Sequence, residues 1–536
     1  MRNTDKLGLV VPTNKETEKF STQNYVDNFD KIDDFAAAVD LSKVDKIAGK
    51  GLSTEDYTTA EKNKVANVPL DTNAQLLDIA NEVDYLKSRN AKVYGVRRVL
   101  GATSPALERL ADSVGKVVEV PIDDSVVTDE LNVYPWNTIK ECIIDSNGRI
   151  WYKGEVGYNS VIGDHMVEFP VFWYRIIQTA TVRDEYISDM PLPAFKVPQL
   201  FMREDGTVIP RVYVAKYKTS KVGGVGLDVS RPLEHPENFR DLASFRTGAV
   251  AKGSGWQQID TWYTFVLHLL YRVKYANLNS QNILSNGITS VRYIAGDTAQ
   301  LAETLVNRIV VLTTVAGNFA VGQTIAIGTS IGSTNVANRC QITAINAING
   351  TQSEIVFDGS PVNISVGNII WCGVQRTGQT AGLNSLTSRQ SGTNGRRSFK
   401  LFGIEDAFGN VYEWMDGLLI NNLVGHVCRN RSQYASALNS NYKPLGYINA
   451  GTDGYPLEMG YDSNNEEAQL PVQIGAGSTT GYADYHYMNT GLRGAFFGGY
   501  SSSGALAGLF FWALGSAPSY AHWFVGGRLL FKPPVH

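Results

Sequence analysis

The sequence predicts an α+β protein that is mostly β. Short apolar runs rich in Val, Ile and aromatic residues, such as 166–177 and 208–218, suit pleated strands better than helices. The pairs Asn147-Gly148 and Asp205-Gly206 are typical of the tight turns that separate such strands. Beyond residue 95, we expect only two stretches to be helical, because only these have apolar residues at helical spacing.

The length and the charge of the chain exclude several classes of protein. The chain has 536 residues, of which 19% are charged, and a net charge of −4. A chain of this length can form several domains. It lacks the excess of basic residues that binds a phosphate backbone, so nucleic-acid binding is disfavoured. The longest apolar runs, 265–271 and 505–514, are too short to cross about 30 Å of hydrocarbon, and no basic and apolar leader opens the sequence. We therefore expect a soluble protein without membrane insertion.

The cysteines predict no redox or metal site. Cys142, Cys340, Cys372 and Cys428 stand far apart in the sequence. They form no CxxC pair, and no histidine is spaced as a second metal ligand. We expect four buried free thiols.

The N-terminal region differs from the rest by its density of charged residues. Within it, Leu76, Ile79, Val83 and Leu86 recur at steps of three and four residues, which predicts an amphipathic helix. This helix is either packed within the chain or shared between subunits, and we assign 41–95 as a helical oligomerisation region. Residues 96–120 mix Gly, Ser and Pro with basic residues, which predicts a linker.

Two helices are expected after the linker. The clearer one opens at 254–260 and continues with apolar residues at helical spacing, namely Trp262, Phe265, Val266, Leu269 and Val273. A weaker pattern covers 237–245.

Residues 300–377 predict a separate small domain. They contain five or six short alternating strands with Gly-Asn, Asn-Gly and Asp-Gly turns and almost no helix former. This pattern indicates a small all-β barrel inserted into a host domain. The two parts of that host would be 121–299 and 378–536.

Two N-terminal segments carry a resemblance to a known class of proteins. FSTQNYVDNFDKID, at 20–33, and KVDKIAGKGLSTEDYTTAEKNKV, at 43–65, resemble segments near the N-termini of bacteriophage tail fibre and baseplate proteins. The resemblance implies that the chain is attached to a virion or to a phage-tail-derived particle. We assign 1–40 as the particle-attachment segment.

A second resemblance lies at 403–414, GIEDAFGNVYEW. It resembles the GN-(V/A)-x-E-W element of formylglycine-generating enzymes and of the C-type-lectin-like proteins related to them. The resemblance implies a calcium ion held by Asn410, Glu413 and the carbonyl of Val411, since calcium prefers oxygen ligands. The alternative is that Asn410 makes a turn, Glu413 hydrogen-bonds to backbone and Trp414 fills the core. The oxidation carried out by those enzymes needs two cysteines, whereas Cys428 stands alone in this region.

The C-terminal segment, 491–531, resembles the ligand-binding segment of phage receptor-binding proteins of the major tropism determinant type, a variable C-type-lectin-like domain. The resemblance implies a framework and a set of displayed side chains, which tyrosine, tryptophan and serine suit because they give adaptable contacts. The framework residues are Gly498, Gly499, Arg493 and Arg528, where glycines permit tight turns and the arginines could lock strands. The displayed residues are Tyr500, Ser501, Ser503, Trp512, Ser516, Tyr520, His522 and Trp523. Phe496, Phe510 and Phe524 are expected in the core.

These observations favour a receptor-binding protein over an enzyme. The seven histidines form no HExxH pattern, and no GxSxG is present. The expected partners are a host cell-surface glycan or protein, and other tail or baseplate proteins through the N-terminus. By analogy with tail fibres, the expected assembly is a homotrimer within a virion or tail-like particle. Two alternatives stay open, an architectural baseplate subunit with a degenerate lectin fold and a surface-polysaccharide depolymerase.

Overall fold

A computed structural model describes residues 2–3, 10–11, 90–392 and 394–534 of the chain. The chain divides into two compact units, 1–81 and 82–536. In the first unit, strands β1 (Arg2–Asn3) and β2 (Val10–Val11) pair antiparallel. The predicted helix over 76–86 and nearly all of the predicted attachment and oligomerisation segments lie outside the described residues.

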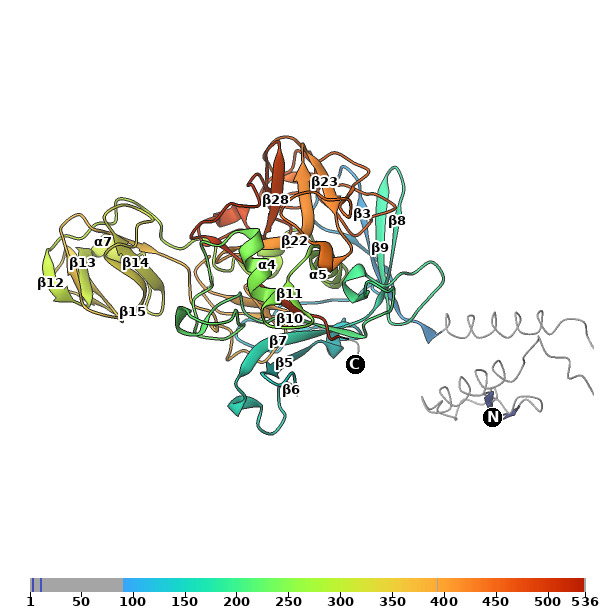
Figure 1. The fold of residues 1–536 in the computed structure, drawn as a ribbon, viewed down its shortest axis with the longest axis horizontal. Helices are drawn as coiled ribbons and strands as arrows, with labels where there is room; N and C mark the ends of the chain where they lie inside the picture. Colours follow the sequence, from blue (N-terminus) through green and yellow to red (C-terminus); the bar gives the residue numbers. More distant parts are fainter. Residues whose placement is uncertain (1, 4–9, 12–89, 393, 535–536) are drawn as a thin grey trace, which may run out of the picture. The chain divides into compact units, whose positions relative to one another are not determined.

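The second unit is mostly β, as predicted, with several antiparallel sheets (Figure 1). Three large sheets lie outside the predicted insert. The first has the order β4 (Glu108–Ala111), β3 (Val93–Val99), β9 (Val182–Ser188), β8 (Trp173–Gln178). The second has the order β11 (Trp256–Gln258), β31 (Leu529–Phe531), β10 (Arg211–Ala215), β7 (Gly163–Pro170), β5 (Lys140–Asp145), β6 (Ile150–Tyr152). The third has the order β24 (Lys443–Pro444), β23 (Val424–Val427), β22 (Tyr412–Asn421), β28 (Leu492–Phe497), β29 (Trp512–Leu514), β27 (His486–Met488), and β30 (Val525–Gly526) pairs parallel with β22.

Smaller sheets and short helices complete this unit. One sheet joins β19 (Ser388–Arg389), β20 (Phe399–Leu401) and β21 (Ile404–Glu405), and another joins β25 (Pro456–Met459) and β26 (Pro471–Ile474). The α-helices are α4 (Leu242–Val250), α5 (Thr261–Tyr275), α6 (Ser280–Ile283) and α7 (Thr313–Ala316). Single 3-10 turns are η1 (Trp136–Thr138), η2 (Tyr158–Ser160), η3 (Gln199–Phe201), η4 (Val222–Gly224), η5 (Arg431–Gln433) and η6 (Gly504–Leu506).

Helix α5 is the centre of the main hydrophobic core. Every residue of the helix is buried, and it packs against β3, β9 and β22, which belong to two different sheets. Its apolar residues Trp262, Phe265 and Leu269 join the largest apolar cluster of the described chain. The helix begins at Thr261, because the Asp260 side chain accepts from the amide of Tyr263 at 3.0 Å and caps the first turn.

The start of this helix differs from the prediction. Residues 254–260 were expected to open it, but Trp256–Gln258 forms strand β11 and pairs with β31 at the C-terminal end of the chain. The weaker helix is also shifted, because α4 begins at Leu242 rather than at 237. Here Asp241 accepts from the amide of Ser244 at 2.8 Å. Both shifts arise because an aspartate cap, rather than the apolar spacing, sets the first turn.

The predicted linker is not a linker. Residues 96–120 contain most of β3 and all of β4, which pair with each other, and β3 also pairs with β9 along its whole length. Arg98, within β3, is buried against Glu458 with an N–O distance of 3.0 Å. The Gly and Pro residues of this stretch therefore mark turns between strands. By contrast, the turn predictions at Asn147-Gly148 and Asp205-Gly206 are confirmed, with φ of 79° and 85° at the two glycines.

Residues 303–372 form a compact β structure within the second unit. Five strands pair in the order β13 (Arg308–Leu312), β16 (Gln352–Phe357), β15 (Ala337–Ala347), β14 (Thr324–Gly328), β18 (Ile369–Cys372), and β12 (Glu303–Val306) pairs with β17 (Val362–Ile364). Buried residues such as Ile309, Ile325, Ile342 and Ile355 form a core separate from that of α5. The pairing path from β13 to β18 is open, so the strands form a sheet rather than the closed barrel that was predicted.

The chain enters and leaves this insert at neighbouring points. Ala299 donates its amide to the carbonyl of Asn368 at 2.8 Å, and Gly367 donates to the carbonyl of Ala299 at 3.0 Å. An insertion whose two ends are hydrogen-bonded to each other leaves the path of the host unchanged.

The cysteine prediction is confirmed, since all four are buried free thiols. No helix within the described residues is long and apolar enough to cross a membrane.

The first prediction concerns the insert. Replacing residues 301–366 by Asn-Gly should leave a host that still unfolds cooperatively, because the two ends already meet. The melting temperature should fall by several degrees, since Trp371 in β18 would lose its cover from the insert. Circular dichroism during thermal unfolding measures both quantities. A shortened chain without a cooperative transition would contradict the separation of the two cores.

Candidate functional site

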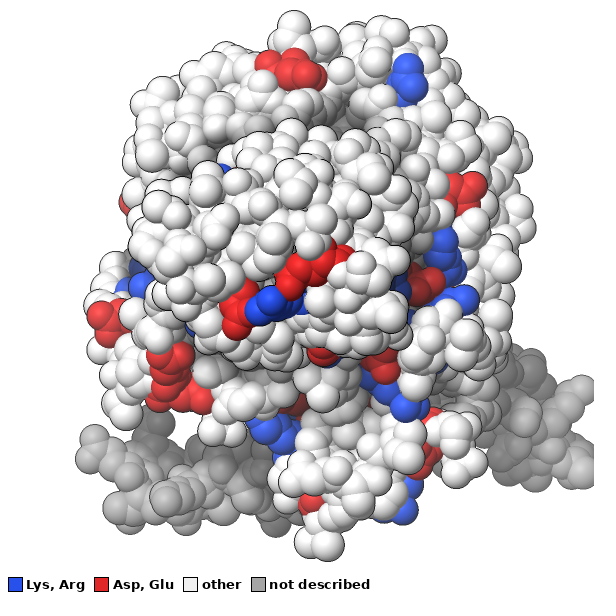
Figure 2. Space-filling model, turned by 90° about the vertical axis from the view of Figure 1, so that its left-hand side faces the viewer, with Lys and Arg blue, Asp and Glu red and all other residues white. Residues whose placement is uncertain are grey.

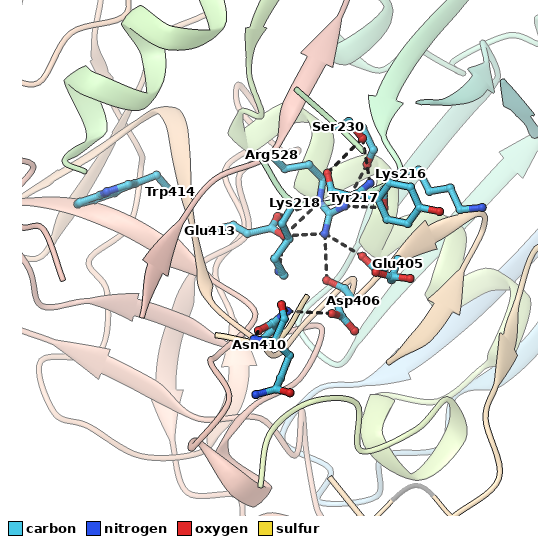
Figure 3. Close-up of polar contacts among 12 residues, drawn as sticks. Lys216, Tyr217, Lys218, Ser230, Glu405, Asp406, Asn410, Glu413, Trp414 and Arg528 are labelled. Atoms are coloured by element: carbon cyan, nitrogen blue, oxygen red, sulfur yellow. Dashed lines mark hydrogen bonds and ion pairs between the residues drawn. The ribbon is translucent and has the colours of Figure 1, made fainter. Parts of the chain in front are cut away.

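Arg528 lies at the centre of a buried network of charged side chains (Figure 3). Its side chain is fully buried, and both oxygens of the Glu413 carboxylate accept from it at 2.7–3.2 Å. It also donates to four backbone carbonyls at 2.9–3.0 Å, those of Ala215, Lys216, Glu405 and Asp406. Every nitrogen of the guanidinium thus has a partner, and the side chain fastens β10, β21 and β22 to the last strands of the chain. This confirms Arg528 as a framework residue that locks strands.

Glu413 carries the negative charge of this network. Lys218, which is also buried, donates to the same carboxylate. Burial lowers the pKa of Lys218, and although burial opposes ionisation of Glu413, the charges of Arg528 and Lys218 hold the pKa of Glu413 below its ordinary value. Because two cations face one buried carboxylate, removal of Glu413 would leave two buried cations without compensation, whereas removal of either cation would leave Glu413 with a single partner.

The implied calcium ligands have other partners. The Glu413 carboxylate faces the two buried cations. The Asn410 amide exchanges two hydrogen bonds with the backbone of Gln375, at 2.9 and 3.0 Å, and its own φ is +64°. Among the described residues, no group of three or more His, Cys, Asp and Glu side chains could hold a metal ion. Asn410 therefore makes a turn and Glu413 forms an ion pair, an arrangement closer to the alternative interpretation of this motif.

Two further carboxyl groups lie beside Arg528. Burial, together with the neighbouring charge of Glu405, raises the pKa of Asp406 to about 7. Burial also raises the pKa of Glu405, which accepts from the amides of Gly378 and Thr380 at 2.7 Å. Both residues are at most 2% exposed.

Some of the residues that were predicted to be displayed are buried, and others are partly exposed. Trp512, Ser501 and Ser503 are buried, whereas Ser516 is half-buried. Trp523 is only 5% exposed and packs between Tyr293 and Trp371, with ring centroids 5.3 and 5.2 Å away. The surface assignment of these four buried residues is therefore wrong. Trp371 of the insert packs against Trp523, and His268 of α5 and Phe497 pack against Trp512. Tyr500, Tyr520 and His522 are partly exposed, as expected of displayed residues.

The structure agrees with some of the other framework and core predictions and differs from the rest. Gly498 and Gly499 have φ of 86° and 80°, and a Cβ on Gly499 would lie 2.5 Å from that of Ala507, so both positions require glycine. Arg493 is half-buried, and its Nε donates to Thr490 in its own turn, so it does not lock strands. Phe496 and Phe510 are core residues as predicted, whereas Phe524 is partly exposed. Trp414 is fully buried against Phe496, as the alternative interpretation of its motif predicted.

Partly exposed aromatic side chains gather along one part of the third sheet and its loops. We call this set the aromatic row, and its members are Phe239, Tyr455, Tyr485, Tyr487, Tyr500, Tyr520, His522 and Phe524. At one end, the ring centroids of His522 and Phe524 are 4.1 Å apart, and those of Tyr500 and Phe524 are 4.7 Å apart. At the other end, Tyr485 lies 5.0 Å from Tyr455 and 4.8 Å from Tyr487. The buried rings of Tyr412 and Phe511 join the two ends.

Phe239 is the most exposed ring of the row. Its side chain is 61% exposed and its φ is +54°, a conformation that is costly for a bulky residue. The backbone keeps this conformation because its amide donates to the carbonyl of His522 at 3.0 Å, while Asn238 donates to that of Trp523.

Sequence reasoning missed five of the eight members of the aromatic row, because Phe524 was expected in the core and four others were not singled out, namely Phe239, Tyr455, Tyr485 and Tyr487. The pattern YHY at 485–487 was a usable signal, because alternate residues of a strand share one face. No comparable signal marks Phe239 or Tyr455, which come from loops. Charged side chains are scattered over the face that Figure 2 shows, which is otherwise uncharged.

No protein family matches this chain, and a comparison with characterised proteins finds no match either.

The second prediction compares the two framework arginines. Arg528→Ala should lower the free energy of unfolding by about 3–5 kcal/mol, because it leaves Glu413 buried with less compensation. Arg493→Ala, the matched control, should change it by no more than about 0.5 kcal/mol, since it removes one contact at the surface. Urea denaturation measures both. Equal effects of the two substitutions would contradict the central role of Arg528.

The third prediction concerns pH. The pKa of Asp406 is about 7 in the folded protein against 3.8 for an ordinary aspartate, so between these values the folded chain keeps a proton that the unfolded chain releases. The contribution of Asp406 to stability is therefore complete at low pH and decreases as the pH rises towards 7. Asp406→Asn, which stays neutral, should gain stability relative to the unchanged protein as the pH rises from about 4 to about 7, on the order of a few kcal/mol.

Urea denaturation at several pH values tests this expectation. The exposed Asp453→Asn is the control for the loss of a carboxylate. A constant difference between Asp406→Asn and the unchanged protein across this pH range would contradict the raised pKa.

Proposed function

We propose that this chain is the receptor-binding protein of a phage tail or of a phage-tail-derived particle, and that the aromatic row contacts the host ligand. The observation that carries the proposal is the exposure of eight neighbouring aromatic side chains on a scaffold that pairs its charges internally. Aromatic rings give large contact areas at a small cost in side-chain entropy, which suits recognition. The host ligand is a cell-surface glycan or protein.

The proposal includes the C-type-lectin-like character of the domain formed by 121–299 and 378–536. What supports it is the arrangement of the GNVYEW motif, where Asn410 turns the chain, Glu413 pairs with Arg528 and Trp414 fills the core. The last strands return to β22 and to β10, so the two ends of the domain meet in shared sheets. The C-terminal segment, 491–531, is thus held at its start by pairing of β28 with β22 and at its end by pairing of β31 with β10.

We propose a role without catalysis. The carboxyl groups with the most strongly raised pKa values, Asp406, Glu467 and Asp484, are each at most 6% exposed. A depolymerase needs acid groups that reach the sugar, so this distribution favours binding over hydrolysis. The remaining alternative is an architectural tail subunit, which the experiment below separates from an adhesin.

Attachment would rely on several copies of the chain. A shallow surface gives modest affinity at each site, and several copies on one particle raise avidity by roughly a hundredfold or more. We therefore propose a homotrimer joined through 41–95 and docked on the particle through 1–40.

The fourth prediction tests the aromatic row. Combined Phe239→Ala, Tyr520→Ala and His522→Ala should abolish attachment of the labelled protein to host bacteria while shifting the melting temperature by only a few degrees, because these side chains are partly exposed. Flow cytometry on a panel of bacterial strains measures attachment.

Trp523→Ala is the matched control from the same segment. Because Trp523 is buried, its loss should lower stability by about 3–5 kcal/mol. Deletion of 490–536 is not a suitable control, because it removes Arg528, on which the fold depends. A triple variant that still attaches, or that fails only in particle assembly, would favour the architectural alternative.

A further inference from the structure

A groove lined by amide side chains lies between the insert and the host. Its main cavity has a volume of about 430 Å³ and is lined from the insert by Gln323 and Gln341, and from the host by Gln379, Gln390, Arg396 and Arg397. A second cavity of about 410 Å³ adjoins it and shares Gln379, Gln390 and Arg397. We call the two together the amide groove. Its size is within the range of small-ligand sites in proteins.

Several polar groups of the groove have no partner within the described chain. Gln323 is 5% exposed, and its Nε2 is buried without a hydrogen bond, whereas its Oε1 accepts from the amide of Ala320 at 2.8 Å. A buried donor left unpaired costs free energy, so a ligand that accepts from it would recover that cost. Arg396 is half-buried and Arg397 is exposed, and neither forms an ion pair with a described residue.

Other members of the groove are already held in position. Gln341 donates to the carbonyl of Gly322 at 3.1 Å, and Gln390 donates to the carbonyl of Gln379. Gln379 accepts from the amide of Ser398 at 3.4 Å. A rigid set of amides is prepared for binding, because its side-chain entropy has already been lost in folding.

The chemistry of the lining indicates the class of ligand. A planar amide offers a donor and an acceptor side by side, which matches the hydroxyl groups of a saccharide. Val321, which is 59% exposed, adds apolar surface for the C–H groups of a sugar ring. The two guanidinium groups have the geometry to bind a carboxylate or a phosphate bidentately. Asp123 lines only the second cavity, where its carboxylate accepts from the amide of Ser391 at 3.2 Å.

We propose that the amide groove binds an anionic saccharide, with its acidic group on Arg396 and Arg397 and its hydroxyl groups on the glutamines. The acidic group is either the carboxylate of a uronic-type sugar or the phosphate of a sugar phosphate. This site is separate from the aromatic row and goes beyond the proposed function, since it does not depend on attachment to a particle.

The fifth prediction uses four probes with the full chain, namely glucose, glucuronate, glucose 6-phosphate and inorganic phosphate. Saturation-transfer NMR titration to about 10 mM should show binding of glucuronate or glucose 6-phosphate in the millimolar range, and binding of glucose at least about tenfold weaker. The comparison of the two acidic sugars decides between carboxylate and phosphate, because their rings are the same.

Variants assign the binding to the groove. Combined Arg396→Gln and Arg397→Gln should reduce binding of the acidic sugar to the level of glucose, because only the charge interaction is lost. Gln390→Ala should weaken all the sugars alike. Arg493→Gln, a half-buried arginine elsewhere, should change nothing, and the triple variant of the aromatic row should retain sugar binding even if it loses attachment.

Three results with the unchanged protein would overturn the proposal. These are no binding of either acidic sugar, equal binding of glucose and its acidic derivatives, and binding of inorganic phosphate as tight as that of glucose 6-phosphate. The last result would identify a simple anion site. Unchanged binding in the double arginine variant would also exclude the groove.

Discussion

The ion pair between Arg528 and Glu413 is the constraint on which the rest of the second unit depends. Glu413 lies in β22, and Arg528 lies between β30 and β31 near the end of the chain. Because the guanidinium also binds four backbone carbonyls, it holds strands that come from four separate parts of the sequence. A neutral side chain of similar volume could fill the space but could not satisfy those carbonyls. The position of every residue in the C-terminal segment follows from this contact.

The same use of charge explains the nature of the surface. Arg272 pairs with Glu185, and Lys400 pairs with Glu141, both out of contact with solvent. Charges committed to internal pairs do not appear on the surface, where aromatic and amide side chains are exposed instead. Such a surface selects ligands by shape, stacking and hydrogen bonds rather than by long-range attraction. The two arginines of the amide groove form no ion pair with a described residue, which is why an acidic ligand is expected there.

The insert adds surface to the host at little cost to its fold. Its ends meet at Ala299 and Asn368, so its own core forms without altering the host strands. Its β18 then brings Trp371 against Trp523 of the C-terminal segment. One consequence is that Trp523 becomes a buried contact between the two parts. The other is that glutamines from both sides face each other across a groove that neither part would form alone.

The sequence by itself determined the mostly β class, the position of the insert, the four free cysteines and the buried state of Trp414, because these depend on local alternation, turn residues and apolar content. It also singled out Arg528, Gly498 and Gly499 as framework. Tertiary structure alone decided which aromatic rings are exposed. Tyr520 and Trp523 are aromatic residues of the same short segment, and they differ only in what packs over them. It likewise decided that Glu413 pairs with Arg528 and Lys218, and that Phe239 joins His522 on one surface. Contacts between residues hundreds of positions apart have no periodicity in the sequence, so only the folded chain defines them.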